Sequence, residues 1–302
     1  MSGGNIPYHL RQNKAIDRNL FIELLAKLNR YRNISDYIYI GFGGPFLEDF
    51  KAIHAYSGIN QMISIEMNAG VYKRQRFNLP LNCIDCRLTA SEQFLKDYSF
   101  DRNTIVWLDY TEPRKLGAQL NEIEFLFTRL QAYDIVKVTL NANANALADR
   151  QGLKEDEDLN EKRLKVLKQR AGRYLPPEVS EDMVTNDEYP SLLCKAVENA
   201  AKRGMTGKSR FFFQPLTAFI YADSMHKMLT LTGMILPDEN EEIERFFRDT
   251  GIKSWPLSTQ GNRPITSRIQ WFYVQDFKQI VSIPTGLQPL GLNAAFQCFF
   301  LL

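Results

Sequence analysis

Residues 37–50, YIYIGFGGPFLEDF, decide how this sequence is expected to fold. Tyr37 to Ile40 form a short run of β-branched and aromatic residues, which is typical of a buried strand. A glycine turn follows at 41–44, and Phe46 to Tyr56 has the pattern of a helix. Such a turn lets the backbone approach a ligand, while the next helix presents free N–H groups. Its spacing is G-x-G-G rather than G-x-G-x-x-G, so the dinucleotide fingerprint is incomplete.

The alternation of strands and helices continues on both sides of this segment. Further strands are expected at 61–66, 81–86, 104–108 and 135–140, and helices at 13–32, 69–77, 90–96 and 116–131. Strands that alternate with helices at intervals of roughly 20–30 residues are typical of a doubly wound, mostly parallel sheet. The sequence therefore predicts a Rossmann-like α/β fold.

The domain organisation follows from where this alternation stops and resumes. We expect an N-terminal helical segment at 1–35, a Rossmann-like cofactor-binding core at 36–143, a helical insertion at 144–210, late strands of the core sheet at 211–237 and a C-terminal elaboration at 238–302. Short strands are expected within the elaboration at 270–274 and 279–283. The insertion and the elaboration are expected to cap the ligand crevice and to select the substrate.

Composition excludes several classes of protein. The 302 residues carry 37 Lys+Arg and 35 Asp+Glu, a net charge of +2, with 44% hydrophobic residues, which is ordinary globular composition. Near-neutral charge does not support binding to nucleic acid over the whole surface, although it leaves a local basic groove open. The absence of a secretory signal and of an apolar span predicts a cytoplasmic protein. Cys83 and Cys86 have no second ligand pair, so no metal site is expected.

Acidic residues end two of the later strands. Glu66 stands 25 positions after Gly41 (66 − 41), where a carboxylate can accept hydrogen bonds from both hydroxyls of a ribose. Asp109 and Tyr110 follow the apolar strand 104–108, and a carboxylate there is costly unless a ligand, cation or backbone donor meets it. We therefore expect both residues near the reacting atoms. A solvated Glu66, and an Asp109 that caps the next turn, are the structural alternatives.

These segments resemble the class I S-adenosylmethionine-dependent methyltransferase fold, closest to a group of bacterial proteins labelled putative O-methyltransferases. The resemblance covers residues 20–143 and, more loosely, 211–236. It implies S-adenosylmethionine as cofactor. By the resemblance, the methionine part would lie at Gly41, Phe42, Gly43 and Gly44, the ribose at Glu66, the adenine at Met67, Ala90 and Ser91, and the methyl group beside Asp109 and Tyr110, the expected catalytic residues. Gly43→Val is then expected to abolish binding without unfolding the protein.

The methyl acceptor stays open at this point. The chain has no D/N-P-P-Y/F motif and no Lys–Asp–Lys–Glu tetrad, so methylation of DNA-base amines or of ribose is not supported. The first alternative is an inactive subunit of the same fold that binds a nucleotide-type ligand or a protein partner, for example in a bacterial defence system. A second is an NAD-dependent oxidoreductase, which fits Glu66 but lacks the full fingerprint. Assembly with a partner protein or with a second copy is equally open.

Overall fold

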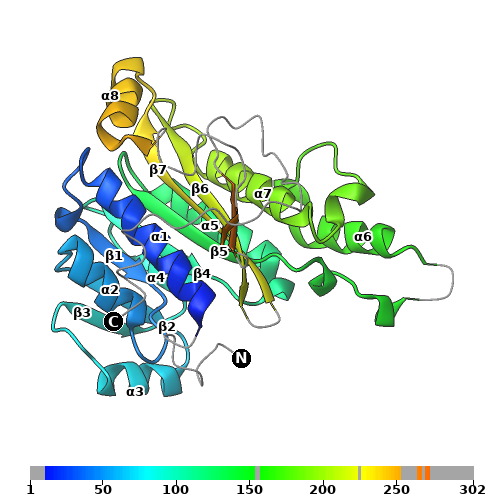
Figure 1. The fold of residues 1–302 in the computed structure, drawn as a ribbon, viewed down its shortest axis with the longest axis horizontal. Helices are drawn as coiled ribbons and strands as arrows, with labels where there is room; N and C mark the ends of the chain where they lie inside the picture. Colours follow the sequence, from blue (N-terminus) through cyan, green and yellow to red (C-terminus); the bar gives the residue numbers. More distant parts are fainter. Residues whose placement is uncertain (1–10, 154–156, 224–225, 253–263, 267–268, 273–302) are drawn as a thin grey trace.

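The centre of the molecule is one sheet with the strand order β3-β2-β1-β4-β5-β7-β6-β9-β8 (Figure 1). The computed structural model describes residues 11–153, 157–223, 226–252, 264–266 and 269–272. The parallel strands are β1 (Ile38–Gly41), β2 (Met62–Glu66), β3 (Ile84–Leu88), β4 (Thr104–Asp109) and β5 (Ile135–Asn141). The order 3-2-1-4-5 is that of a doubly wound sheet, so the predicted fold class is confirmed.

The late strands extend this sheet in the antiparallel sense. β7 (His226–Pro237) lies between β5 and β6 (Phe211–Asp223) and is antiparallel to both. β9 (Ile269–Phe272) pairs with β6, and β8 (Pro264–Thr266) pairs with β9. The expected strand at 270–274 thus overlaps β9, with its last two positions outside the described residues. The expected strand at 279–283 lies wholly outside them.

Helices cover both faces of the sheet. On one face, α1 (Gln12–Leu28), α2 (Glu48–Ser57) and α8 (Asn240–Thr250) share a buried cluster that includes Phe21, Phe50, Trp107 and Phe246. On the other face, α4 (Ser91–Asp97), α5 (Leu116–Arg129), α6 (Leu159–Ala171) and α7 (Tyr189–Gly204) contribute to a second cluster. The two clusters make the layers of a doubly wound fold. α3 (Ala69–Phe77) lies beside β2 and β3.

One predicted strand is shifted. The strand expected at 81–86 begins at Ile84 and ends at Leu88, because Asn82 and Cys83 form a turn before it. Ile84 and Cys86 are buried and Asp85 is exposed, which is the alternation of a strand with one covered face. The shift moves the end of β3 level with the end of β2, where Glu66 pairs with Leu88.

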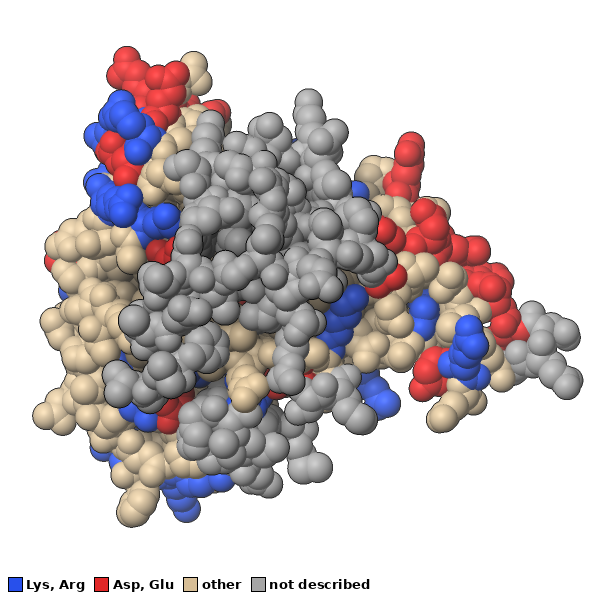
Figure 2. Space-filling model, viewed as in Figure 1, with Lys and Arg blue, Asp and Glu red and all other residues tan. Residues whose placement is uncertain are grey.

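The segment 144–210 contains two helices with different positions. α7 packs so closely on α5 that a Cβ at Gly204 would lie 2.1 Å from the carbonyl oxygen of Glu124. Ten residues of α7 are buried, so this helix belongs to the layer that covers the sheet. α6 reaches away from the sheet in Figure 1, and its arm carries side chains of both charge signs in Figure 2.

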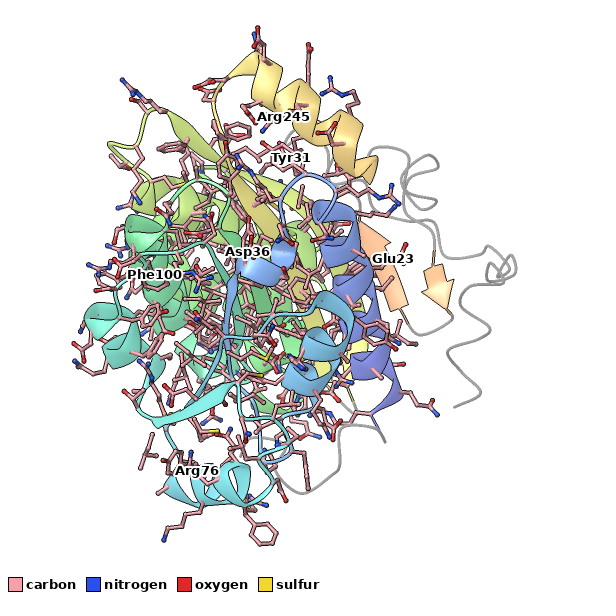
Figure 3. The ribbon with its side chains drawn as sticks, turned by 90° about the vertical axis from the view of Figure 1, so that its left-hand side faces the viewer. Glu23, Tyr31, Asp36, Arg76, Phe100 and Arg245 are labelled. Atoms are coloured by element: carbon pink, nitrogen blue, oxygen red, sulfur yellow. The ribbon has the colours of Figure 1, made fainter. Side chains whose placement is uncertain are left out.

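α8 packs against the turn that follows α1, where Tyr31 contacts Phe246. Figure 3 shows Tyr31 beneath α8 near Arg245, whose guanidinium lies 5.2 Å from the centre of the Tyr31 ring. The Tyr31 hydroxyl also donates a hydrogen bond to Glu242, which lies on α8. No helix in the described part of the chain is long and apolar enough to cross a membrane.

Candidate functional site

The residues singled out in the sequence gather at one edge of the sheet. Gly41, Glu66 and Asp109 end β1, β2 and β4, three neighbouring parallel strands. The strand order reverses between β1 and β4, since β2 and β3 lie on one side of this pair and β5 lies on the other. Open α/β sheets bind ligands at such a point, beyond the carboxyl ends of the strands. The topology therefore brings the expected loops to one edge of the sheet.

The glycine loop packs tightly against its own surroundings. A Cβ at Gly43 would lie 2.3 Å from Cδ2 of Leu47 and 2.5 Å from Oγ of Ser64, and Gly44 has a positive φ of 54°. Two side-chain amides hold the loop, since Gln75 on α3 donates to the carbonyl oxygen of Gly44 at 2.9 Å and Asn78, directly after α3, donates to that of Pro45 at 2.8 Å. The hypothesis that Gly43→Val abolishes binding without unfolding therefore stays a prediction, and we now expect some loss of stability as well, because the added side chain would meet Ser64 on β2 and Phe50 on α2.

Glu66 is half-buried and ordered by the loop that follows it. The backbone N–H of Asn68 donates to Oε1 of Glu66 at 2.7 Å, while the Asn68 side chain caps α3. Burial raises the pKa of Glu66, although the backbone donors oppose this shift. Met67, the next residue in the chain, and Leu88, which pairs with Glu66 on β3, are 71% and 50% exposed. The end of β2 thus combines a carboxylate with uncovered apolar surface.

Asp109 is paired with a lysine from α1. Nζ of Lys14 forms an ion pair with Oδ2 of Asp109, and the two side chains are only 2% and 9% exposed. The other oxygen, Oδ1, is buried and has no hydrogen-bond partner in the part of the chain that the structure describes. The structural alternative, in which Asp109 only caps the following turn, has no matching hydrogen bond among the described residues.

A second ion pair fastens α1 to the helix behind the glycine loop. Nε of Arg18 lies 2.5 Å from Oδ1 of Asp49 at the start of α2, with both side chains buried. Burial alone would raise the pKa of Asp49, but Arg18 and Lys14 outweigh it and hold that pKa below its usual value.

The charged residues of α1 were missed in the sequence, although a signal was present. Lys14 and Asp17 continue the spacing of Phe21, Leu24 and Leu28, so they occupy the buried stripe of the helix. Charged residues at such positions indicate buried partners on another element. The sequence does not say which elements provide them.

Tyr110 is committed to a different neighbour. Its hydroxyl donates to Oε1 of Glu122 on α5 at 2.6 Å, and burial together with this carboxylate raises the pKa of Tyr110 well above its usual value. Ser91 also hydrogen-bonds to Glu122, and Phe42 packs edge-on against Tyr110 with ring centres 5.8 Å apart. Glu122, which the sequence analysis did not single out, therefore joins two of the expected residues, Tyr110 and Ser91. Ala90 lies beside them as the residue before α4.

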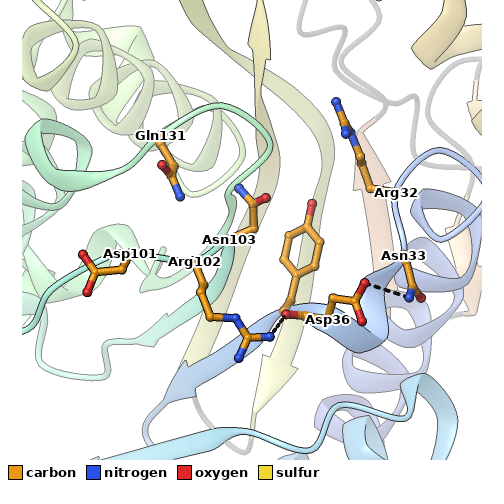
Figure 4. A pocket seen from close by; sticks show the side chains of 8 residues that line it. Arg32, Asn33, Asp36, Asp101, Arg102, Asn103 and Gln131 are labelled. Atoms are coloured by element: carbon orange, nitrogen blue, oxygen red, sulfur yellow. Dashed lines mark hydrogen bonds between the residues drawn. The ribbon is translucent and has the colours of Figure 1, made fainter.

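A cavity of about 470 Å³ lies at the opposite edge of the sheet, where β1 and β4 begin (Figure 4). Arg32, Asp36 and Arg102 line it, but Arg102 is already bound to Gln61 and to the carbonyl oxygen of Asp36, each at 2.6 Å. This cavity contains none of the residues expected to carry chemistry. Within the described residues, no group of His, Cys, Asp and Glu side chains could hold a metal ion.

Comparison with known proteins identifies the family. The profile of a family described as "Putative O-methyltransferase" matches residues 6–271, which is most of the chain. The chain belongs to this family. No curated protein matches it at a significant level.

Solved structures are similar to the chain to different degrees. Trm1 from Pyrococcus horikoshii, solved with S-adenosyl-L-methionine, superposes with a TM-score of 0.50 at 11% identity, covering 76% of this chain. This chain spans 57% of the length of that protein. An O-methyltransferase from Bacillus cereus, solved with S-adenosylhomocysteine, matches with a TM-score of 0.39 at 10% identity, covering 77% of this chain and 84% of its own. This O-methyltransferase family member therefore has the class I methyltransferase fold that the sequence predicts.

Proposed function

We propose that this O-methyltransferase family member binds S-adenosylmethionine at the carboxyl edge of β1, β2 and β4 and transfers its methyl group to an acceptor. The observation that carries the proposal is that the glycine loop, Glu66 and Asp109 follow or end three neighbouring parallel strands at the same edge of the sheet, where the strand order reverses between β1 and β4. The sulfonium makes the methyl group electrophilic, so the protein has mainly to align the acceptor and receive its proton.

The residues present fit this cofactor. Glu66 offers a carboxylate for the ribose hydroxyls, and the exposed Met67 and Leu88 offer apolar surface for the adenine ring. The glycine loop 41–44 would receive the methionine part, and Ala90 and Ser91 lie at the start of α4 for the adenine amine. The unpartnered Oδ1 of Asp109 is a buried acceptor at the end of β4. Such an atom is costly unless a ligand satisfies it.

The catalytic part of the proposal rests on Asp109 alone. The hydroxyl of Tyr110 is bound to Glu122 and its pKa is raised, so Tyr110 is better suited to fixing the wall of the site than to receiving a proton. This observation also supports the second candidate, a subunit of the same fold that binds the cofactor without turnover.

Calorimetry with S-adenosylhomocysteine and with NAD tests the cofactor. We expect S-adenosylhomocysteine to bind in the low-micromolar range or weaker, and NAD not to bind. Binding of NAD alone would favour the oxidoreductase alternative, and binding of neither compound would contradict the proposal.

A radiolabel-transfer assay then separates the enzyme from the inactive subunit. Wild type and Asp109→Asn are incubated with methyl-labelled S-adenosylmethionine and with RNA, DNA, protein and small-molecule extracts. Asp109→Asn should lower transfer strongly and leave cofactor affinity within a few fold, because it removes charge but little volume. Equal transfer by both proteins would remove Asp109 from the mechanism.

A further inference from the structure

α1 contributes a charged group directly to the proposed site. Lys14 lies in the first turns of the helix and reaches Asp109 at the end of β4. The pair is buried, and burying an ion pair costs desolvation energy that a hydrophobic contact would avoid. The C-terminal half of α1 does use hydrophobic contacts, through Phe21, Leu24 and Leu28. Two further buried pairs, Asp17–Lys137 and Arg18–Asp49, hold the same half of α1, and the pair between Lys14 and Asp109 differs from them in its position at the end of β4, at the proposed site.

The carboxylate of Asp109 is used on one side only. Oδ2 is occupied by Lys14, whereas Oδ1 is buried and none of the described residues hydrogen-bonds to it. A ligand donor that reached Oδ1 would share the same carboxylate with the ammonium group of Lys14. A second ammonium at that place would stand within a few ångströms of the first, and like charges repel strongly at a buried site. An uncharged hydroxyl donor meets no such repulsion.

Among the described residues, the buried ion pairs around Asp109 leave no excess negative charge to offset a second cation. Lys14, Arg18 and Lys137 face Asp109, Asp49 and Asp17, which gives three cations against three carboxylates. These groups act on one another, since Asp17, Asp49 and Asp109 all oppose the lowering of the pKa of Lys137 by burial. The charges of these six described residues therefore sum to zero before a ligand binds.

We propose that Lys14 is a specificity-determining residue, which neutralises Asp109 so that Oδ1 accepts a hydrogen bond from an uncharged hydroxyl acceptor rather than from an ammonium group. The inference rests on the proposed function. In the transfer, the acceptor O–H bond breaks and an O–CH₃ bond forms. The electron pair of the broken C–S bond stays on sulfur, and the proton passes to Oδ1 of Asp109 and then to water.

The charge that the site presents to the reacting centre can be measured without an acceptor. S-adenosylmethionine and S-adenosylhomocysteine differ by the methyl group and by the positive charge on sulfur. The ratio of their affinities, measured by calorimetry, therefore reports the local charge. Lys14→Met leaves Asp109 uncompensated and should raise the preference for S-adenosylmethionine about tenfold. Lys14→Arg keeps the charge and should restore the wild-type ratio.

Lys137→Met is the matched control, because it also breaks a buried ion pair between α1 and the sheet but leaves the contact between Lys14 and Asp109 in place. It should shift the ratio less than Lys14→Met does, because the carboxylate left without its cation is then Asp17 on α1 rather than Asp109 at the end of β4. If Lys14→Met does not fold, Asp109→Asn gives a second test of opposite sign, since it leaves Lys14 uncompensated and should shift the preference toward S-adenosylhomocysteine by a few fold. An unchanged ratio in Lys14→Met, or an equal shift in Lys137→Met, would overturn the proposal. Binding of neither compound by wild type would instead defeat the proposed function.

The chemistry of the product provides the acceptor test. Label transferred from methyl-labelled S-adenosylmethionine into a cell extract should be released as volatile methyl iodide by hot hydriodic acid, as an O-methyl group is. N-methyl label resists the same treatment and stays in solution. In Lys14→Met the retained fraction should rise, because a bare carboxylate favours a cationic acceptor. Retained label with the wild type, or no incorporation despite cofactor binding, would overturn the assignment of a hydroxyl acceptor.

Discussion

Nζ of Lys137 on β5 lies 2.8 Å from Oδ1 of Asp17 on α1, and the two side chains are 1% and 0% exposed. The hydroxyl of Thr230 on β7 donates to the same oxygen at 3.0 Å, and the Lys137 ammonium lies 4.2 Å from the centre of the Trp107 ring. Burial lowers the pKa of Lys137, and the neighbouring carboxylates oppose that shift. The N-terminal half of α1 is thus bound to the sheet by charge.

Removing Lys137 should be strongly destabilising. Lys137→Met leaves Asp17 as an uncompensated buried charge, and we expect a loss of about 3–5 kcal/mol in the free energy of unfolding, measured with urea. The double variant Asp17→Asn/Lys137→Met should recover part of this loss, because it removes both charges. Lys96→Met is the control, since the pair between Lys96 and Glu92 is exposed and should change stability by less than about 1 kcal/mol. A double variant as unstable as the sum of the single variants would show that the two charges do not depend on each other.

Glu66 should matter for cofactor binding more than for folding. Glu66→Gln keeps the volume but removes the charge that would meet the ribose hydroxyls, and we expect the affinity for S-adenosylhomocysteine to fall by about 1–3 kcal/mol. Asp85→Asn is the control, because Asp85 is an exposed carboxylate on the neighbouring β3. Calorimetry on the two variants measures the difference. Equal affinities in Glu66→Gln and in wild type would leave Glu66 with only its role in ordering the loop through Asn68.

The two glycines at positions 43 and 172 should respond in opposite directions to alanine. At Gly43 the new Cβ would lie 2.3 Å from Leu47 and 2.5 Å from Ser64, so we expect a loss of about 1–3 kcal/mol. At Gly172, after α6, the Cβ would meet nothing within 4 Å, and alanine should be neutral or stabilise by up to about 1 kcal/mol. Thermal unfolding of both variants decides the matter. A neutral Gly43→Ala would mean that the loop can shift and is not held by its packing.

Stability should depend on pH through Glu198 on α7. Burial raises the pKa of Glu198 to about 8, opposed in part by Lys195, from an ordinary value of 4.5. The folded protein therefore holds a proton that the unfolded chain releases, and this residue lowers stability as the pH rises from 4.5 to 8. Glu198→Gln should match wild type near pH 4.5 and exceed it by about 2–4 kcal/mol above pH 8. Urea unfolding across this range checks the trend, with the exposed Glu178→Gln as a control that should follow wild type.

Much of the fold could be predicted because its signals are local. The strand–glycine–helix unit at 37–50 and the helical stripe of α1 depend on residues close together in the chain. The edge of the sheet where Gly41, Glu66 and Asp109 meet also follows from the sequence, since parallel strands place their carboxyl ends on one side. The bounds of the strand near 81–88 did not follow from the sequence in the same way, because the turn at Asn82 and Cys83 delays the start of the strand to Ile84.

The contacts between distant elements could not be read in the same way. The sequence marks Lys14 as a charge on an apolar stripe, but only the packing of α1 across the sheet brings it to Asp109, 95 positions later. In the same way Tyr110 stands next to Asp109 in the chain, yet its hydroxyl turns to Glu122 on α5. The sequence by itself determined the order of the elements and the edge that carries the site, because periodicity and turn chemistry act over a few residues. The tertiary structure decided which carboxylate keeps a free oxygen, because a buried charge takes its partner from whichever element packs against it.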